Sequence, residues 1–570
     1  MPPTTPTLKD AAAPARWLPR AAVELAALIC LGLAWYWPTR RAGWVTDILG
    51  LAPRLTEANG LDGAWTGYGS PVFHPLTLGL HYLLWHLGGP SSLLYYAVWV
   101  GLHAGTAYLL VLGVRALTAH YRLARGRESA WVAGLAFLIY PYVVEPVVWR
   151  ATLNYLLCVP LLLGASAGVF AFAETGHLRA LALSLLAALL ALLCFDLAWV
   201  TPALAALAVF AGARLGNRRM QLRRLGTAVS THTALLAAYL LTKSAVIGTA
   251  VGHYGAGVHL DFDPGLILPN AWRQLTKALF LTRELPFARK EALNNWLGAS
   301  PVYGFATALA VGLLAWWLWR LGPRSRRWRL SGLLGIGALV AIAPTANLYY
   351  YWVLGAENDR YSYFPAVWIV ALLSVAWGGI GSRAVRYGLA AVALVAYGYF
   401  NRVQVMHWAE ASYAQHLLLE AFPAADVPDG VYVLAAADNY RGTYLFRDGM
   451  PPYTGVDANL RYLRERTSAD TVENLVNYNQ MSLEDSVAAV VNARGEIELS
   501  FRQGGNWFWR GGIGLSDYER PSFRVTAGYP VRVCFKEALP PGTRLLYPTG
   551  RTWTSLPTDG LRTCREVDAQ

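Results

Sequence analysis

The sequence predicts a mostly α protein, in which a polytopic bundle of about eleven transmembrane helices precedes a soluble C-terminal domain of mixed α/β, largely β, structure. Three observations support this fold class. The 570 residues are 55% hydrophobic and 15% charged, whereas soluble domains have about 25% charged residues. Many apolar blocks reach the roughly 18–20 residues that cross a bilayer. The basic residues are concentrated in the short connectors between these blocks.

The predicted spans all lie within residues 1–403. A polar segment with Lys9, Arg16 and Arg20 precedes the first apolar run, and no small-residue cleavage site follows it, so we interpret this run as a span. Helices are expected because backbone groups in lipid must find partners within their own segment. The predicted spans are approximately 20–38, 92–114, 129–147, 151–173, 178–194, 197–213, 228–249, 301–320, 330–347, 362–380 and 385–403.

The arginines in the connectors predict the orientation of the bundle. Clusters at 115–127, 214–224 and 320–329 fall on the same side as the N-terminus, and the positive-inside rule makes that side cytoplasmic. We therefore expect a multi-pass protein of the plasma (inner) membrane whose C-terminal domain is periplasmic or extracellular. This placement of basic residues also argues against nucleic acid as a partner, despite the net charge of +13.

The connectors on the other side of the membrane are longer and poorer in arginine. The first, about 39–91, contains Asp47 and the segment Pro75–Leu87, which is too short to span and is expected at the membrane surface. The second, about 251–300, contains a predicted amphipathic helix around Pro269–Thr282. Large loops on one face predict a functional site built there.

Residues 404–570 have the polarity of a soluble domain. We expect a helical lead at about 407–421, and the alternating runs EIELSF (496–501) and VRVCF (531–535) predict strands. Cys534 and Cys564 lie outside the predicted spans, so they are expected to form a disulfide if this domain faces an oxidising compartment.

Two carboxylates at the outer ends of predicted spans are candidate functional groups, because charges are costly at that depth. Asp47 in WVTDILG suits a general base, and the alternative is that it caps the following helix. Glu145 in YPYVVEPVVWRATLNY lies among valines and must face a ligand or a partner. That partner could be Arg150.

A third cluster lies in ENDRYSYFP, residues 357–365. Arg360 with the nearby hydroxyl of Tyr363 suits a phosphate, because a guanidinium offers a planar fork of donors. The alternative is an aromatic belt with an arginine reaching the membrane surface. His74, His81 and His86 lack the spacing of metal ligands, so interfacial histidines are the preferred interpretation.

These stretches resemble the GT-C superfamily of membrane glycosyltransferases, especially the group of protein O-mannosyltransferases and aminoarabinose transferases. Three departures are visible. Thr46 precedes Asp47 where many relatives have a second acid, and His74 replaces an arginine. The arginine of the EPVVWRATLNYLL stretch lies next to the tryptophan, at Arg150, and Asn154 stands where that arginine would be expected. The matching features are Asp47 in the first outside loop, the His74–Thr77 segment, EPVVWRATLNYLL, ENDRYSYFP, and ADNYRGTYLFRDGMP at 437–451.

The resemblance implies inverting transfer of a sugar from a polyprenyl-phosphate donor to a protein, lipid or glycan acceptor, next to membrane lipids at the outer face. It makes Asp47 the base and Glu145 a second acid of the cleft. Some relatives use a divalent metal ion and others do not, so the resemblance assigns no cofactor and leaves a divalent metal open. The implied phosphate-binding residues are Arg360, Tyr363 and Arg150, and the further substrate-site candidates are His74, Asn154, Glu357 and Asp359.

Three other functions stay open. An O-antigen ligase or polymerase would depend on arginine and histidine in a late outside loop, whereas here the acids of the first loop and third span favour the GT-C interpretation. A transporter or flippase predicts paired repeats and charges deep in spans, for which Glu24 and Asp196 are the only candidates. The third is a non-catalytic assembly subunit.

Overall fold

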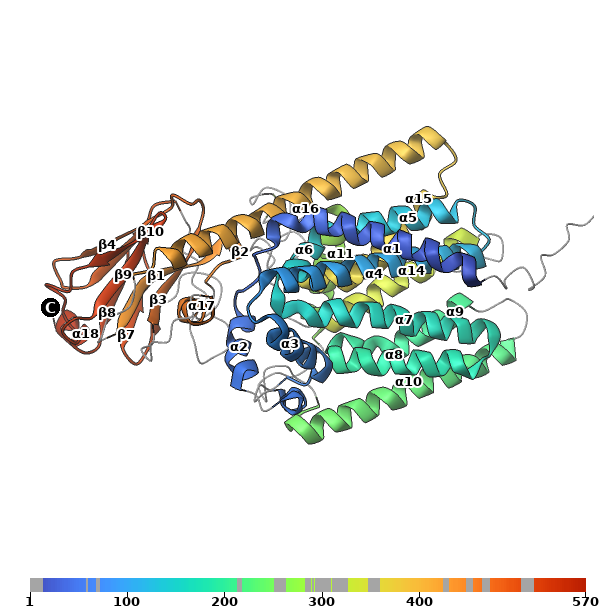
Figure 1. The fold of residues 1–570 in the computed structure, drawn as a ribbon, viewed down its shortest axis with the longest axis horizontal. Helices are drawn as coiled ribbons and strands as arrows, with labels where there is room; N and C mark the ends of the chain where they lie inside the picture. Colours follow the sequence, from blue (N-terminus) through green and yellow to red (C-terminus); the bar gives the residue numbers. More distant parts are fainter. Residues whose placement is uncertain are drawn as a thin grey trace, which may run out of the picture.

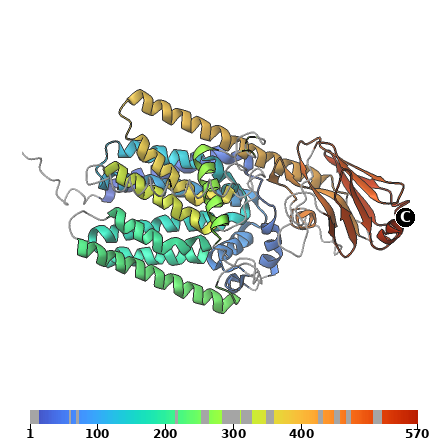
Figure 2. The same ribbon diagram turned by 180° about the vertical axis from the view of Figure 1, so that it is seen from behind.

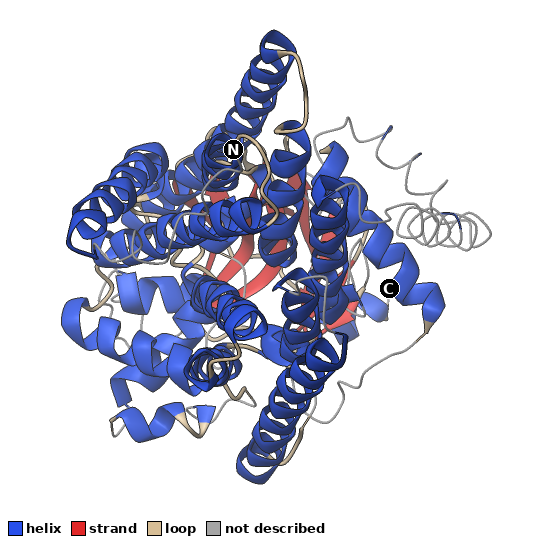
Figure 3. Ribbon diagram, turned by 90° about the vertical axis from the view of Figure 1, so that its right-hand side faces the viewer, coloured by secondary structure: helices blue, strands red, loops and turns tan. Residues whose placement is uncertain are grey.

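The computed structural model describes residues 14–57, 60–67, 72–212, 218–250, 263–281, 289, 292, 309, 326–346, 359–423, 430–446, 455–463, 472–503 and 517–569. It consists of a helical bundle and a β-rich C-terminal domain, which lies beyond one end of the bundle (Figure 1). Viewed along the bundle, the strands lie behind the helices (Figure 3).

Long helices packed side by side form the bundle (Figures 1 and 2). Shorter helices cover the end that faces the C-terminal domain: η2 (Trp37–Thr39), α2 (Asp47–Glu57), η3 (Leu61–Ala64), α3 (Pro75–Gly88), η5 (Pro141–Val143), α6 (Val144–Val148), η6 (Arg150–Thr152), η7 (Asp196–Val200), α11 (Pro264–Phe280) and η9 (Asp359–Ser362). The longer helices are α1 (Pro14–Tyr36), α4 (Ser92–His120), α5 (Gly126–Leu138), α7 (Leu153–Thr175), α8 (Leu178–Cys194), α9 (Thr201–Gly212), α10 (Arg218–Ile247), α14 (Arg326–Ala346), α15 (Tyr363–Trp377) and α16 (Arg383–Glu420).

The described helices are those of a membrane protein. Six of them are long and apolar enough to cross a membrane, or seven if the bent pair Gly126–Leu138 and Pro141–Val148 counts as one span. The helices Leu178–Cys194 and Asp196–Gly212 are apolar but shorter. Each predicted span overlaps a described helix except 301–320, which lies outside the described residues apart from Leu309. A total of about eleven spans stays a prediction.

Helix α16 joins the bundle to the C-terminal domain (Figure 1). It runs without interruption for 38 residues, so the helical lead expected at 407–421 is the continuation of the last predicted span rather than a separate element. The boundary expected between residues 403 and 404 therefore falls inside a helix. The polarity of the sequence changes there, but no proline interrupts α16 and its last glycine is Gly398, so nothing ends the helix.

The described residues of the C-terminal domain form two sheets of five strands. In the first, the order is β10-β9-β1-β2, and β3 also pairs with β1; β1 runs parallel to β3 and β9. The second is antiparallel, in the order β4-β5-β8-β7-β6, and its strands β5 and β8 coincide with the two predicted ones. The elements are β1 (Val431–Tyr440), β2 (Thr443–Tyr444), α17 (Gly455–Leu463), β3 (Val472–Gln480), β4 (Val487–Val491), β5 (Ile497–Phe501), β6 (Tyr518–Glu519), β7 (Phe523–Thr526), β8 (Val531–Phe535), β9 (Arg544–Thr549), β10 (Thr552–Leu556) and α18 (Cys564–Asp568).

The two parts of the molecule have separate hydrophobic cores, and α16 belongs to both. Val405 and Trp408 are buried in the core of the bundle. Ala411 and Leu418, further along the same helix, are buried against the strands of the C-terminal domain. Cys534 at the end of β8 and Cys564 at the start of α18 form a disulfide. Because α16 is shared, the C-terminal domain is fixed close to the loops at the end of the bundle.

Candidate active site at the end of the bundle

The candidate site begins at a break between α5 and α6. Pro141 and Pro146 cannot donate backbone hydrogen bonds, and Tyr142 has a non-helical backbone conformation, so the chain bends by 55° here. The short helix α6 then places Glu145 against η9, whose residues directly precede α15.

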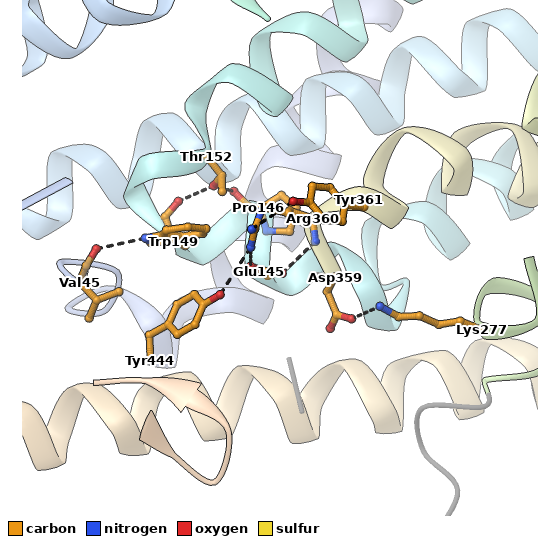
Figure 4. Close-up of polar contacts among 10 residues, drawn as sticks. All are labelled: Val45, Glu145, Pro146, Trp149, Thr152, Lys277, Asp359, Arg360, Tyr361 and Tyr444. Carbon is orange, nitrogen blue, oxygen red and sulfur yellow. Dashed lines mark hydrogen bonds and ion pairs between the residues drawn. The ribbon is translucent and has the colours of Figure 1, made fainter. Parts of the chain in front are cut away.

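Glu145 and Arg360 form a buried ion pair at this break (Figure 4). The Arg360 guanidinium donates to Glu145 Oε1 at 2.7 Å, and the Arg360 backbone N–H donates to Oε2 at 2.8 Å. Both carboxylate oxygens are therefore bonded, and the Glu145 side chain is completely buried. Arg150, five residues away in sequence, is not the partner of Glu145, because the bend turns the carboxylate toward η9 instead.

Aromatic side chains surround the Arg360 cation. Its guanidinium carbon lies 5.1 Å from the Trp149 ring centroid and 4.8 Å from that of Tyr361, within range of cation–π attraction. The hydroxyl of Tyr444, in strand β2 of the C-terminal domain, lies 3.5 Å from Arg360 Nη1. Burial alone would lower the pKa of Arg360, but Tyr361, Glu145 and Tyr444 hold this pKa above its ordinary value. The guanidinium thus stays charged.

Trp149 connects this pair to the loop between η2 and α2. Its indole N–H donates to the Val45 carbonyl at 3.1 Å (Figure 4). The Arg150 backbone N–H donates to the Gly43 carbonyl at 3.2 Å. Asp47 follows two residues after Val45, as the first residue of α2, and its side chain is partly exposed. The structure thus pairs Glu145 with Arg360 directly and bonds the segment before Asp47 to the turn beside them.

A second ion pair flanks the first. Asp359, which is also buried, pairs with Lys277 of α11 (Figure 4). The Lys277 ammonium lies 4.8 Å from the Tyr142 ring centroid, and the Tyr140 hydroxyl donates to the Ala278 carbonyl at 2.7 Å. The amphipathic helix predicted around 269–282 is thus α11, Pro264–Phe280, and it contributes a cation next to the break between α5 and α6.

Tyr363 does not join the Arg360 cluster, contrary to the sequence-based prediction. His103 Nε2 donates to the Leu138 carbonyl at 3.1 Å, so His103 Nδ1 accepts from the Tyr363 hydroxyl at 3.0 Å. Tyr363 begins α15, and its side chain is buried among α4 and α5 rather than beside η9. The hydroxyls near Arg360 belong to Tyr361 and Tyr444 instead.

His74 belongs to a different cluster. It precedes α3, and its Nε2 lies 3.9 Å from a carboxylate oxygen of Asp196. Asp196 also accepts from the Lys243 ammonium at 2.9 and 3.0 Å and from the Tyr239 hydroxyl at 3.1 Å. These contacts give His74 a partner within the bundle.

The remaining predicted residues are placed as follows. Asn154 lies in the first turn of α7, where its Oδ1 accepts from the Tyr155 backbone N–H at 3.1 Å. Glu357 lies outside the described residues. Arg150 is fully buried, with its guanidinium carbon 5.8 Å from the Trp99 ring centroid. The described part of the chain contains no group of three or more His, Cys, Asp or Glu side chains arranged to hold a metal ion.

Three side chains at the site were not singled out from the sequence: Trp149, Lys277 and Tyr444. Trp149 and Tyr444 lie in two of the stretches that carry the GT-C resemblance, so those stretches held the signal. The sequence signal for Lys277 was weaker, because it was only a basic residue on a predicted amphipathic helix. No protein-family model and no curated protein matches this sequence.

Proposed function

We propose that this protein is a GT-C-type membrane glycosyltransferase, which moves a sugar from a polyprenyl-phosphate donor to an acceptor at the outer face of the plasma membrane. The observation that carries the proposal is the buried Glu145–Arg360 pair, held between the broken helix α5–α6 and Tyr444 of the C-terminal domain. Charged pairs are costly near lipid and usually mark functional sites there. An arrangement with about eleven spans, the N-terminus in the cytoplasm and this site outside is part of the same proposal.

In the proposed reaction, the Asp47 carboxylate takes the proton of an acceptor hydroxyl or amine. The acceptor atom bonds to the anomeric carbon from the face opposite the donor oxygen, and the configuration is inverted. The bond between the anomeric carbon and the donor oxygen breaks, and the polyprenyl phosphate leaves with the bonding electrons. Nearby cations stabilise the negative charge that develops on the phosphate.

The pairing of Glu145 changes the role that we assign to it. Because both of its oxygens accept hydrogen bonds from Arg360, we assign Glu145 to positioning Arg360 rather than to proton transfer. Asp47 is partly exposed and begins a helix beside the site, so it is the better candidate for the base. The acceptor in this proposal is a protein, a lipid or a glycan.

The experiment is a transfer assay in proteoliposomes with radiolabelled polyprenyl-phosphate sugars and extracts of candidate acceptors, with and without a metal chelator. We expect Asp47→Asn to reduce transfer by roughly 100-fold or more, the usual scale for loss of a general base. Asp263→Asn is the matched control, since Asp263 caps the exposed start of α11 and asparagine caps equally well.

Two results would contradict the proposal. The first is wild-type transfer by Asp47→Asn protein that is correctly inserted. The second is a wild-type protein that moves the lipid donor across the bilayer without transferring its sugar, which would favour the transporter alternative. The ion pair of Asp196 with the buried Lys243 is the feature that such a transporter would use.

A further inference from the structure

A cavity of about 340 Å³ lies inside the helical bundle, away from the candidate active site. Five helices enclose it in a ring, α4, α7, α9, α14 and α15, and each packs against the next. The lining begins at Leu109 of α4 and Leu163 of α7. Leu109 lies ten residues beyond Trp99, whose indole bonds to the Trp149 carbonyl at the candidate site, and Leu163 lies ten residues beyond the start of α7. Ten residues of helix rise roughly 15 Å. The cavity therefore belongs to the half of the bundle nearer the viewer in Figure 3, which the proposed orientation makes cytoplasmic.

The lining of this cavity is almost entirely hydrocarbon. Among the described residues that line it, only Ser166 and Trp368 have polar side-chain atoms, and the Ser166 hydroxyl already donates to the Leu162 carbonyl at 2.9 Å. Water needs two to four polar partners in a protein interior, so a hydrocarbon chain fits this lining better than water does. The volume is also within the roughly 300–1,000 Å³ typical of ligand pockets. Because the cavity lies in a membrane bundle, the hydrocarbon at hand is the acyl chain of a lipid.

Arginines border the end of the cavity that is far from the candidate site. Arg329, next to the first lining residue of α14, donates to the Phe210 carbonyl at 3.2 Å, and Phe210 itself is followed by a lining residue of α9. Arg327 donates to the Val375 carbonyl at 2.6 Å, about one helical turn beyond Ala371, which lines the cavity. Both guanidinium groups therefore bond to backbone within about one turn of the lining.

These arginines have no acidic partner among the described residues. Arg327, Arg329 and the neighbouring Arg125 donate to backbone carbonyls. Glu128, the acid closest to Arg125 in sequence, pairs with Arg386 instead. The carbonyls at a helix C-terminus carry about half a negative charge in total, which offsets these cations only in part. The far end of the cavity thus combines an apolar interior with a positively charged border.

We propose that this cavity holds an acyl chain of an anionic glycerophospholipid, whose phosphate binds at Arg327 and Arg329. A guanidinium presents paired N–H groups to two oxygens of a phosphate. Basic pockets between spans on the cytoplasmic side bind anionic lipid headgroups in this way. The lipid is a resident of the membrane and not a substrate, and it lies in the leaflet opposite the proposed reaction. The inference depends on the membrane bundle and not on sugar transfer.

The test is photolabelling of the full chain in phosphatidylcholine vesicles that contain a small fraction of phosphatidylglycerol with a diazirine near the end of one acyl chain. After illumination, mass spectrometry of peptides locates the label, which we expect on residues 109–117 of α4 and 163–170 of α7. Unlabelled phosphatidylglycerol should compete about 10-fold more strongly than phosphatidylethanolamine, because hydrogen bonds between charged groups add that much.

Three outcomes of this experiment would overturn the proposal. Absence of label from these two segments would mean that something other than a lipid chain fills the cavity. Equal competition by phosphatidylethanolamine would mean that the site does not select an anionic headgroup. Stronger competition by a polyprenyl phosphate than by phosphatidylglycerol would assign the cavity to a polyprenyl chain.

A cavity-filling variant tests the place of the acyl chain. Gly113 lines the cavity, and a Cβ there would meet no atom within 4 Å, so Gly113→Leu fits without a clash and occupies the space. It should abolish the label on α7. Gly105→Leu is the matched control, because Gly105 lies on the same helix, also has open space at its Cβ and does not line the cavity. This control should keep the label, and labelling of Gly113→Leu at the wild-type level would contradict the proposal.

A charge variant tests the headgroup, and it does so even if Gly113→Leu fails to fold. Arg329→Gln keeps a donor for the Phe210 carbonyl but loses the charge, so phosphatidylglycerol should lose its advantage over phosphatidylethanolamine. Arg402→Gln is the matched control, since Arg402 also donates to a backbone carbonyl, that of Trp35, at 3.0 Å, but lies near the opposite end of the bundle. An unchanged preference in Arg329→Gln would overturn the proposal. None of these measurements contains a sugar or an acceptor, so lipid binding without transfer activity would refute the proposed function alone.

Discussion

Glu145 and Arg360 differ in how strongly each depends on the other. The Glu145 side chain is completely buried, whereas 19% of the Arg360 side chain is exposed. Removing the arginine would therefore leave a carboxylate fully enclosed. Removing the carboxylate would leave a cation that reaches solvent and still contacts two aromatic rings and the Tyr444 hydroxyl. Loss of one partner from a buried pair costs about 3–5 kcal/mol.

We accordingly predict that Arg360→Met lowers the free energy of unfolding by roughly 3–5 kcal/mol and that Glu145→Gln lowers it by less. Unfolding of the detergent-purified variants, followed by the fluorescence of their tryptophans, measures both values. If Glu145→Gln proved the more damaging change, the pair would not be held in the way described here.

The sequence placed Glu145 and Arg360 in one candidate site but did not predict that they pair with each other. Glu145 and Arg360 stood out because each is a charge at the border of an apolar block. They are 215 residues apart in sequence, so only the packing of α6 against η9 shows that they meet. Tyr363 was misplaced for a related reason: a spacing of three residues from Arg360 suggests a shared helix face. The two residues lie in different elements, η9 and α15, and the Tyr363 hydroxyl bonds to His103 of α4.

Among the elements, α16 does the most to join the two parts of the molecule, and Asn401 fixes its position. This side chain is fully buried: Asn401 Oδ1 accepts from the Trp35 indole N–H at 2.8 Å, and Nδ2 donates to the Tyr36 hydroxyl at 3.1 Å and the Tyr140 carbonyl at 2.9 Å. One amide therefore ties α16 to the end of α1 and to the residue just before the break between α5 and α6.

We predict that Asn401→Leu lowers the free energy of unfolding by roughly 2–4 kcal/mol, because it leaves buried partners of three hydrogen bonds unsatisfied. The midpoint of thermal unfolding in detergent reports the effect. Val395→Leu, on an exposed part of the same helix, should leave this midpoint unchanged. Equal midpoints for the two variants would mean that Asn401 does not hold α16 in place.

Elements with a regular pattern were predictable, and elements without one were not. Strand β5 alternates in burial and β8 alternates over its first three residues, and both match their predicted ranges to within one residue. In β1 and β3 almost every residue is buried, so no alternation marked them. A separate helical lead after the last predicted span was expected because the polarity changes after Arg402, although the residues there continue to favour one helix.

At the scale of the whole molecule, the candidate site lies where two cores meet. Glu145 and Arg360 come from the bundle. Tyr444, from the C-terminal domain, contacts the Arg360 guanidinium. Tyr444 also packs edge-on against Trp149 and Trp408, with ring centroids 5.2 and 6.0 Å apart. The stability and position of the C-terminal domain should therefore affect the site.

The disulfide between Cys534 and Cys564 offers a way to change the stability of the C-terminal domain. It joins residues 30 apart in sequence, and closing a loop of that length stabilises a domain by roughly 3–4 kcal/mol in the chain-entropy model. We predict that the double variant Cys534→Ser/Cys564→Ser unfolds its C-terminal domain at a lower temperature, as measured by susceptibility to protease. In wild type purified without reductant, both thiols should resist alkylation; rapid alkylation of either would contradict the bond.

The central claim is that Glu145 and Arg360 act as one unit of a sugar-transfer site. The most direct test is the transfer rate of wild type, Glu145→Gln, Arg360→Gln and the double variant, each normalised to the amount of folded protein in the membrane. We predict that each single change slows transfer by roughly 100-fold, and that the double variant is within a few-fold of the slower single one, because residues that act as a unit are not additive. Single variants that transfer at the wild-type rate, or a double variant slowed by the product of the two single effects, would contradict the claim.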